Sequence, residues 1–237
     1  MNTKLISKET VAEGTMLFRF EKPEGFEYKA GQSIDLTLVN PPETDEKGNT
    51  RPFSLVSAPF EKELAIATRM RDSAFKRVLK DMRGGEELAF EGPFGDLTLH
   101  ENAKRKAVIL AGGIGITPFR SIVAQATFQS LPHRITLLYS NRRPEDAAFL
   151  AEFHTFAQTN PNFTFVPTMT AMEQSSQDWD GECGYIDAAM IGKHFTSDEA
   201  ALYYLAGPAA MVAAMRKIVN DMEVSNDDIR TEEFSGY

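Results

Sequence analysis

A glycine-rich run near the middle of the chain has the composition of a phosphate-binding turn. The glycines of residues 112–115 follow an uncharged run, residues 107–111, which is typical of a strand buried on both faces. Glycine lets the backbone turn sharply and approach a ligand that a Cβ would hold away. Thr117 suits the N-cap and Pro118 the first position of a following helix. A strand, a turn and a helix start in this order direct N–H groups and a positive dipole end toward one point, where a phosphate is stabilised.

The spacing of these glycines leaves two interpretations open. The turn lacks the Gly-Lys-Ser/Thr ending of a P-loop, which argues against a nucleoside triphosphate hydrolase. It also lacks the full dinucleotide fingerprint and the acidic residue that normally contacts the ribose. By itself, the turn fits either the phosphate of some nucleotide or an ordinary connection between a strand and a helix.

A second group of residues with binding chemistry is Arg51-Pro52-Phe53-Ser54. An arginine can pair with a pyrophosphate, an aromatic ring can stack on a flat heterocycle, and a serine hydroxyl can hydrogen-bond a ring nitrogen. Four such residues also occur by chance at the start of an ordinary strand. Their meaning therefore depends on what accompanies them along the chain.

Composition excludes several classes of protein. The net charge of −9 argues against nucleic acid as a partner, because phosphate backbones would be repelled. A single cysteine, Cys183, cannot form a disulfide or a four-cysteine cluster within this chain. The four histidines show no metal-ligand spacing, so no metal site is expected. No segment resembles a signal peptide or a membrane span, and we expect a cytoplasmic protein without membrane insertion.

Short alternating segments make up the first part of the chain. Such segments with turn-forming residues between them predict a small antiparallel β-barrel, interrupted by one helix over residues 74–82. The expected strands are residues 14–20, 33–39, 64–70 and 87–91. The segment from Pro41 to Thr50 is expected to be a polar loop.

Longer helical segments alternate with strands in the second part, which predicts a parallel sheet of about five strands covered by helices on both faces. The expected strands are residues 107–111, 134–140, 163–169, 201–206 and 229–234, and the later helices are residues 146–157, a helix from Asp187, and residues 208–222. We place the barrel domain at residues 1–102 and the α/β domain at residues 103–237.

The order of these motifs resembles the ferredoxin–NADP reductase superfamily of FAD-dependent oxidoreductases over nearly the whole chain. The resemblance is carried by the motif at residues 51–54, then Gly-Pro-Phe-Gly at 92–95 and Gly-Gly-x-Gly-x-Thr-Pro at 112–118. Ala-Gly-Pro-Ala-Ala-Met follows at 206–211, and Glu-x-Phe-x-Gly-Tyr ends the chain at 232–237.

This resemblance implies FAD in the barrel and NAD(P)H as co-substrate on the parallel domain, meeting between the two. Ser54 would hydrogen-bond near flavin N5 and Glu232 would place a carboxylate at the reacting edge, so these two are the expected catalytic residues. The implied cofactor-binding residues are Arg51, Pro52, Phe53, Ser54, Thr68, Arg69, Met70, Ser73, Ala74, Lys76, Gly112, Gly113, Ile114, Gly115, Thr117, Pro118, Ser140, Asn141, Arg142, Ala206, Gly207, Pro208, Met211 and Tyr237.

Four positions depart from the pattern of the superfamily. Phe53 replaces the usual tyrosine, Ala206 stands where many members have a cysteine, and Ser73 and Lys76 stand where relatives often have glycine and serine. After the third expected strand, residues 168–171 lack the arginine that NADP-specific relatives place there, which favours NADH or dual use unless Arg142 and Arg143 compensate.

Electrons must leave the flavin for an acceptor outside this chain, because one cysteine cannot hold a cluster. Ferredoxin or flavodoxin is the expected redox partner. Reduction of free flavin, ferric chelates or quinones is an alternative, and a non-catalytic flavin-binding subunit is another. Six basic residues between Arg69 and Arg83 form either a docking surface for an acidic carrier or a solvated helix face.

Overall fold

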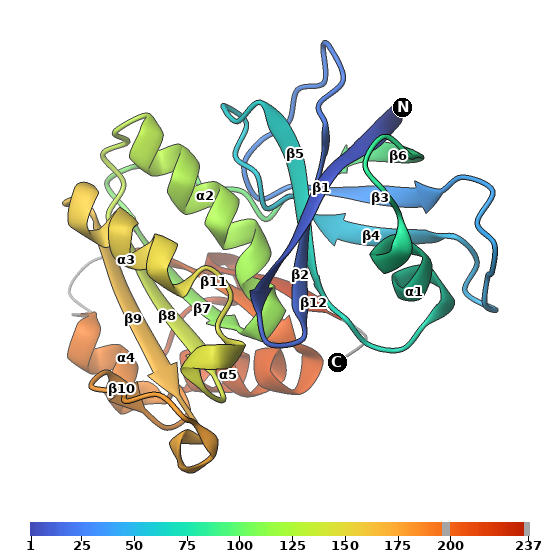
Figure 1. The fold of residues 1–237 in the computed structure, drawn as a ribbon. Coiled ribbons are helices and arrows are strands. Elements are labelled where there is room, and N and C mark those ends of the chain that lie inside the picture. The colour runs from blue at the N-terminus through green and yellow to red at the C-terminus, as the bar shows by residue number, and fades with distance from the viewer. Residues whose placement is uncertain (196–199, 235–237) are drawn as a thin grey trace.

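The computed structural model describes residues 1–195 and 200–234, which form two domains built on two six-stranded sheets (Figure 1). The sheet of the first domain is antiparallel and has the order β4-β3-β6-β1-β2-β5. Its elements are β1 (Asn2–Ala12), β2 (Thr15–Glu21), β3 (Ser33–Leu38), β4 (Thr50–Ser54), β5 (Glu63–Arg69), α1 (Ala74–Asp81) and β6 (Glu87–Phe94). The two edges of this sheet meet where the N–H of Val56 donates to the oxygen of Ala65 at 2.8 Å, so the predicted barrel is present.

Alternating apolar residues from these strands fill the barrel, and α1 covers it with Phe75 and Leu79. The sequence did not predict β1, because only Thr3 and Leu5 of this strand are buried and its alternation is weak. β6 continues to Phe94, three residues past the predicted end at Glu91.

The second domain contains a parallel sheet of the order β10-β9-β8-β7-β11-β12. Its strands are β7 (Lys106–Gly112), β8 (Ile135–Asn141), β9 (Phe163–Met169), β10 (Glu182–Cys183), β11 (Ala201–Pro208) and β12 (Ile229–Phe234). The sixth strand, which corrects the prediction of about five, is the two-residue β10. A strand this short leaves no periodic pattern in the sequence.

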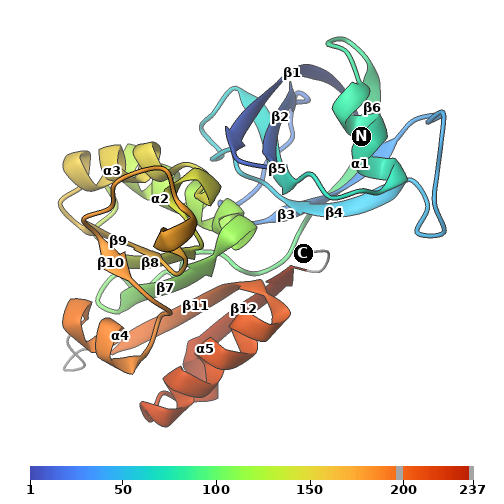
Figure 2. The ribbon, with the colours of Figure 1, turned by 60° about the horizontal axis from the view of Figure 1, so that its bottom comes forward.

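Helices cover both faces of this sheet, with α2 and α3 on one side and α4 and α5 on the other (Figure 2). These helices are α2 (Thr117–Phe128), α3 (Leu150–Thr159), α4 (Ala188–His194) and α5 (Ala209–Asp221). Successive residues of β7 enter different cores: Ala107 and Ile109 pack on the first side, and Val108 and Leu110 on the second. This double burial is the reason that the strand reads as an uninterrupted apolar run.

Two predicted helix starts are wrong in detail. Residues 113–116 form a 3-10 turn, η1 (Gly113–Ile116), that leads directly into α2, so Thr117 is the first residue of the helix and not its N-cap. Pro118 is therefore its second residue. The helix predicted from Asp146 begins at Leu150, because Phe149 adopts a left-handed conformation (φ 62°) that breaks the run after η2 (Pro144–Asp146).

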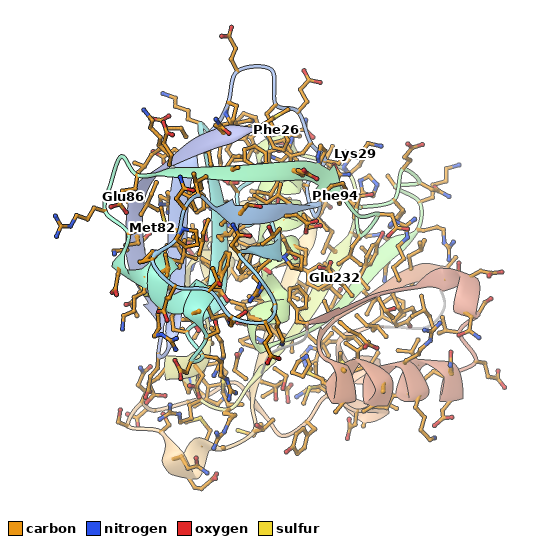
Figure 3. All side chains as sticks on the ribbon, turned by 90° about the vertical axis from the view of Figure 1, so that its right-hand side faces the viewer. Phe26, Lys29, Met82, Glu86, Phe94 and Glu232 are labelled. Carbon is orange, nitrogen blue, oxygen red and sulfur yellow. The ribbon has the colours of Figure 1, made fainter. Side chains whose placement is uncertain are left out.

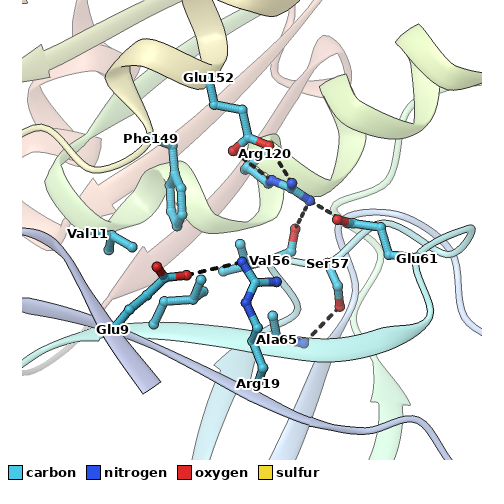
Figure 4. Close-up of a pocket in the computed structure, with 11 residues that line it drawn as sticks. Glu9, Val11, Arg19, Val56, Ser57, Glu61, Ala65, Arg120, Phe149 and Glu152 are labelled. Carbon is cyan, nitrogen blue, oxygen red and sulfur yellow. Dashed lines mark hydrogen bonds and ion pairs between the residues drawn. The ribbon is translucent and has the colours of Figure 1, made fainter. Parts of the chain in front are cut away.

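Arg120 of α2 ties the two domains together in the pocket of about 250 Å³ drawn in Figure 4. Its guanidinium forms ion pairs with Glu61 of the barrel domain and Glu152 of α3 and donates to the oxygen of Val56 at 3.3 Å. Burial lowers the pKa of Arg120, but the two carboxylates raise it overall, so the guanidinium stays charged. On the same helix, Ser121 Oγ donates to the oxygen of Ser57 at 2.7 Å. The orientation of the two domains is thus fixed by buried polar contacts.

Candidate functional site

The two expected catalytic residues meet where the domains face each other. Ser54, at the end of β4, is 4% exposed, and its Oγ donates to Glu232 Oε1 at 2.9 Å. Glu232 lies in β12, opposite Ala206 of β11 in the sheet register. Although 178 positions separate the serine and the carboxylate in sequence, the fold places them in direct contact.

Burial determines the protonation of this pair. It raises the pKa of Glu232, and the charge of Asp96 adds to the increase, while the hydrogen bond from Ser54 acts in the opposite direction. Figure 3 labels Glu232 near the line where the domains meet and, at the end of β6, Phe94, a residue that is 44% exposed. The junction therefore combines a hydroxyl with a carboxyl that holds a proton more readily than usual.

The glycine turn lies at the carboxyl edge of the parallel sheet, at the point where the strand order changes direction. From β7 the chain proceeds outward to β8, β9 and β10, and then returns to β11 on the other side of β7. The ends of β7 and β11 therefore diverge toward helices on opposite faces, which is where open α/β sheets bind ligands.

Contacts of the turn with β11 and with α5 explain two of its glycines. A Cβ on Gly115 would lie 2.5 Å from the carbonyl of Ala206, and a Cβ on Gly112 would lie 2.0 Å from Met211 Sδ. Gly207 has φ 158°, and a Cβ there would lie 3.2 Å from the oxygen of Gly112. The missing side chains thus allow two backbones to pack against each other, and this packing determines the shape of the edge.

Two hydroxyls brace the same turn from within. Thr117 Oγ1 donates to the oxygen of Ile114 at 3.0 Å, and Tyr139 Oη donates to the oxygen of Gly113 at 3.2 Å. Thr117 is only 1% exposed, so its hydroxyl serves the turn itself. The backbone at this edge is held in place before any ligand binds.

The end of β8 contributes a buried amide to the same edge. Both side-chain polar atoms of Asn141 are buried without a hydrogen-bond partner among the described residues. An unpaired buried amide is costly unless a ligand or water satisfies it, so this side chain fits the polar groups of a nucleotide. Beside it, Ser140 is buried, and Arg142 is exposed with its Nη2 2.7 Å from Gln174 Oε1. Arg143, in contrast, pairs with Asp146 and Glu13.

The predicted flavin residues of the barrel also gather in one place. Arg51 lies over the Phe75 ring, with 5.3 Å between its Cζ and the ring centroid, and the half-buried Phe53 ring lies 5.8 Å from the same centroid. Phe75 was absent from the sequence-based set. Pro52 is exposed between Arg51 and Phe53.

The start of α1 lies next to this group. Ser73 is its N-cap, accepting from the N–H of Lys76 at 3.3 Å, and Ala74 is buried behind it. Lys76 Nζ donates to the oxygen of Arg69 at 2.7 Å. Burial lowers the pKa of Lys76, and the charges of Arg71 and Arg51 lower it further. A guanidinium, an ammonium and a helix N-terminus thus converge, and this donor set fits the pyrophosphate of FAD.

The remaining predicted residues support these groups or lie outside the described chain. Thr68 is buried, Met70 packs on the barrel core, and Pro208 is the N-cap of α5. Tyr237 lies outside the described residues. Sequence reasoning missed Asp45, whose carboxylate contacts Arg51, because the sequence of this segment indicates only a polar loop.

Two further properties limit what the described residues can do. They contain no group of three or more metal-ligating side chains. None of the helices described is both long enough and apolar enough to cross a membrane.

Comparisons with known proteins agree with this geometry. Residues 109–217 match the model of the oxidoreductase NAD-binding domain. The chain is 23% identical to reductase component 2 of terephthalate 1,2-dioxygenase from Comamonas sp., over 98% of this chain and 67% of that protein. It is 27% identical to the NAD(P)H-flavin reductase of Aliivibrio fischeri, over 92% of this chain and 90% of that protein.

A solved structure with bound cofactors has the same two-domain fold. The ferredoxin NADP⁺ reductase of Neisseria gonorrhoeae, with FAD and NADP bound, superposes with a TM-score of 0.81 at 22% identity, covering 98% of both chains. Together with the match to the NAD-binding domain, this shared fold agrees with the resemblance seen in the sequence: the chain has the two-domain fold of a ferredoxin NADP⁺ reductase, and its second domain contains an oxidoreductase NAD-binding domain.

Proposed function

We propose that this chain transfers hydride from NAD(P)H to FAD at the Ser54–Glu232 junction and passes the electrons on to a separate acceptor. The observation that carries the proposal is the 2.9 Å contact between Ser54 and Glu232, which joins the end of the expected flavin domain to the nucleotide edge of the parallel sheet. FAD would supply the ring that takes up hydride, and the protein supplies position and exclusion of water.

Each domain would hold one cofactor with its own groups. Arg51 and the start of α1 fit the FAD pyrophosphate, and the Phe53 ring offers an apolar face beside them. On the parallel domain, the rigid turn at 112–117 and the unpaired amide of Asn141 fit NAD(P)H. Ser54 would donate a hydrogen bond at the reacting edge, and Glu232, whose pKa burial raises, would hold a proton there.

Identification of the bound flavin tests the first part of this proposal. The purified protein should be yellow and should release FAD, not FMN, on denaturation, as measured by chromatography of the released flavin. Release of FMN alone, or no bound flavin in protein reconstituted with excess FAD, would contradict the assignment. Reduction of an artificial acceptor by NAD(P)H would then separate an enzyme from a flavin-binding subunit.

The proposed acceptor is a redox protein such as ferredoxin or flavodoxin, and the basic residues around α1 support this proposal. Lys80 and Arg83 are exposed, and neither has an ion pair among the residues described. Exposed cations near the flavin domain would raise the association rate of an acidic carrier, and salt would weaken the effect.

A small-molecule acceptor is the second candidate, because the basic surface is smaller than the sequence suggested. Arg77 pairs with Glu43 at 2.7 Å and also with Asp72, so its charge is already compensated. The similarity to a protein named NAD(P)H-flavin reductase points in the same direction.

Salt dependence distinguishes the two candidates. For a protein carrier, its reduction should slow steeply with added salt, and charge reversal at Lys80 and Arg83 should remove this dependence. Reduction of a neutral dye by the same variants is the control and should hardly change. If the carrier rate does not respond to salt or to the reversals, the acceptor is a small molecule.

A further inference from the structure

The loop between β3 and β4, residues 39–49, places a carboxylate directly on the expected phosphate-binding groups of the barrel. Asp45 Oδ1 lies 2.7 Å from Arg51 Nη2 and accepts from the N–H of Lys47 at 3.0 Å. The backbone N–H of Ala74, at the start of α1, faces Asp45 and helps to lower its pKa. One carboxylate therefore bridges the guanidinium and the helix N-terminus.

Arg51 is held by the same loop on its other side. Its Nη1 donates to the backbone oxygens of Lys47, Gly48 and Thr50 at 2.8 to 2.9 Å. The side chain of Arg51 is 18% exposed and that of Asp45 is 31% exposed, so their ion pair is partly shielded from water. The loop thus occupies both terminal nitrogens of the guanidinium.

A second carboxylate of this loop closes it onto α1. Glu43 receives two hydrogen bonds from Arg77, at 2.9 Å from Nε and 2.7 Å from Nη2. These bonds are the main reason that the pKa of Glu43 is lowered. Burial raises the pKa of Asp45, but the hydrogen bonds from Arg51, Lys47 and Ala74 lower it overall. Both carboxylates are therefore ionised near neutral pH.

An anion that bridges a guanidinium and a helix N-terminal N–H is in the position that a phosphate group would take. We propose that Asp45 determines flavin specificity: it is a built-in anion that the pyrophosphate of FAD must displace from Arg51 and from the start of α1. This inference rests on the proposed function, because it assigns these groups to FAD.

Two consequences follow from this arrangement. Part of the attraction between Arg51 and FAD is offset by loss of the ion pair with Asp45, so FAD binds more weakly than it would to a free guanidinium. A flavin without phosphate, such as riboflavin, does not compete with Asp45. The protein therefore recognises a flavin mainly by its ring, and binding of FAD opens the loop at Asp45.

Flavin affinity in three proteins tests the inference. The dissociation constants of FAD and riboflavin are measured by quenching of flavin fluorescence in the wild type, in Asp45→Asn and in Glu46→Gln. Glu46 lies in the same loop, is exposed and forms no hydrogen bond or ion pair among the described residues, so its substitution removes the same charge away from Arg51. Asp45→Asn should tighten FAD about tenfold and change riboflavin by less than about twofold, and Glu46→Gln should change both by less than about twofold.

Amide hydrogen exchange provides a second readout that needs no turnover. If FAD displaces Asp45, the N–H of Lys47 should exchange faster with FAD bound than without it. Weaker FAD binding in Asp45→Asn, equal changes for FAD and riboflavin, or protection of Lys47 by FAD would overturn the role of Asp45. If the wild type and Asp45→Asn bind FAD with the same affinity and also bind riboflavin equally well, this inference alone is refuted. If the folded wild-type protein binds neither flavin, the proposed function is refuted.

Discussion

The two regions that we propose as nucleotide-binding sites differ in what holds their binding groups in place. On the barrel side, cations are held by carboxylates of the protein, as Asp45 holds Arg51 and Glu43 holds Arg77. On the parallel side, the edge is shaped by backbone packing, as Gly115 shows against Ala206. Charge pairs can be exchanged for those of a ligand, but packed backbone cannot yield without disrupting the fold. We therefore expect ligand binding on the barrel side to change with substitutions that alter charge. On the parallel side, we expect it to change with substitutions that alter the packing of the backbone.

The largest effect is expected at the junction of the two regions. In Ser54→Ala, the flavin should remain bound, while its rate of reduction by NAD(P)H falls by roughly ten- to a thousandfold, as for loss of one positioned donor. Stopped-flow absorbance of the flavin measures this rate. An unchanged rate would make Ser54 a structural residue and would leave the two regions without a shared reacting group.

Substitution of two glycines tests whether backbone packing determines nucleotide binding on the parallel side. Gly115→Ala forces a Cβ against backbone, so we expect NAD(P)H binding to weaken more than about tenfold and the fold to lose about 3 kcal/mol. Gly112→Ala meets the flexible side chain of Met211 and should cost less. Titration calorimetry and urea unfolding measure both effects. Equal losses in the two variants would show that backbone packing does not determine this edge.

Loss of the Arg120 ion pairs that join the two domains should lower the stability of the fold more than the rate of flavin reduction. Arg120→Ala leaves Glu61 and Glu152 facing each other without their cation, and we expect a loss of about 3 kcal/mol in urea unfolding. Arg19→Ala is the matched control, since its pair with Glu9 is exposed and worth less than about 1 kcal/mol. Similar losses in both would mean that the domains are not coupled through Arg120.

The smallest expected effect is on stability and concerns Glu145 of the parallel domain, whose carboxylate accepts hydrogen bonds from Ser175 and Ser176. Hydrogen bonds from its own backbone N–H and from Ser175 and Ser176 lower the pKa of Glu145 from 4.5 to about 2. Because the pKa is lower in the folded state, the stabilisation is present above pH 4.5 and is lost as the pH falls toward about 2.

Urea midpoints at several pH values test this dependence. Glu145→Gln should lower the midpoint slightly at neutral pH, and the difference from the wild type should shrink as the medium is acidified. Glu173→Gln, at an exposed neighbour, is the control and should show no such trend. If the difference in urea midpoint between Glu145→Gln and the wild type stays constant with pH, ionisation of Glu145 does not contribute to stability.

Periodicity and motif order predicted both sheets, most helices and the two residues that meet at the junction. The resemblance named Ser54 and Glu232, but their contact required the fold, because it joins strands of different domains. Asp45 could not be predicted, since a carboxylate in a polar loop shows no pattern until the loop closes on Arg51. β10 was missed because two residues have no periodicity. Sequence patterns indicate which residues are buried, whereas an ion pair formed by a loop residue depends on how the loop folds back onto the rest of the structure.

The most direct test of the central claim is anaerobic mixing of the FAD-loaded protein with NADH and, separately, with NADPH. We predict that the flavin absorbance bleaches within a single turnover, and that Ser54→Ala slows this step while it still binds both the flavin and the nucleotide. A loaded, folded wild-type protein that binds nucleotide but whose flavin stays oxidised would contradict it.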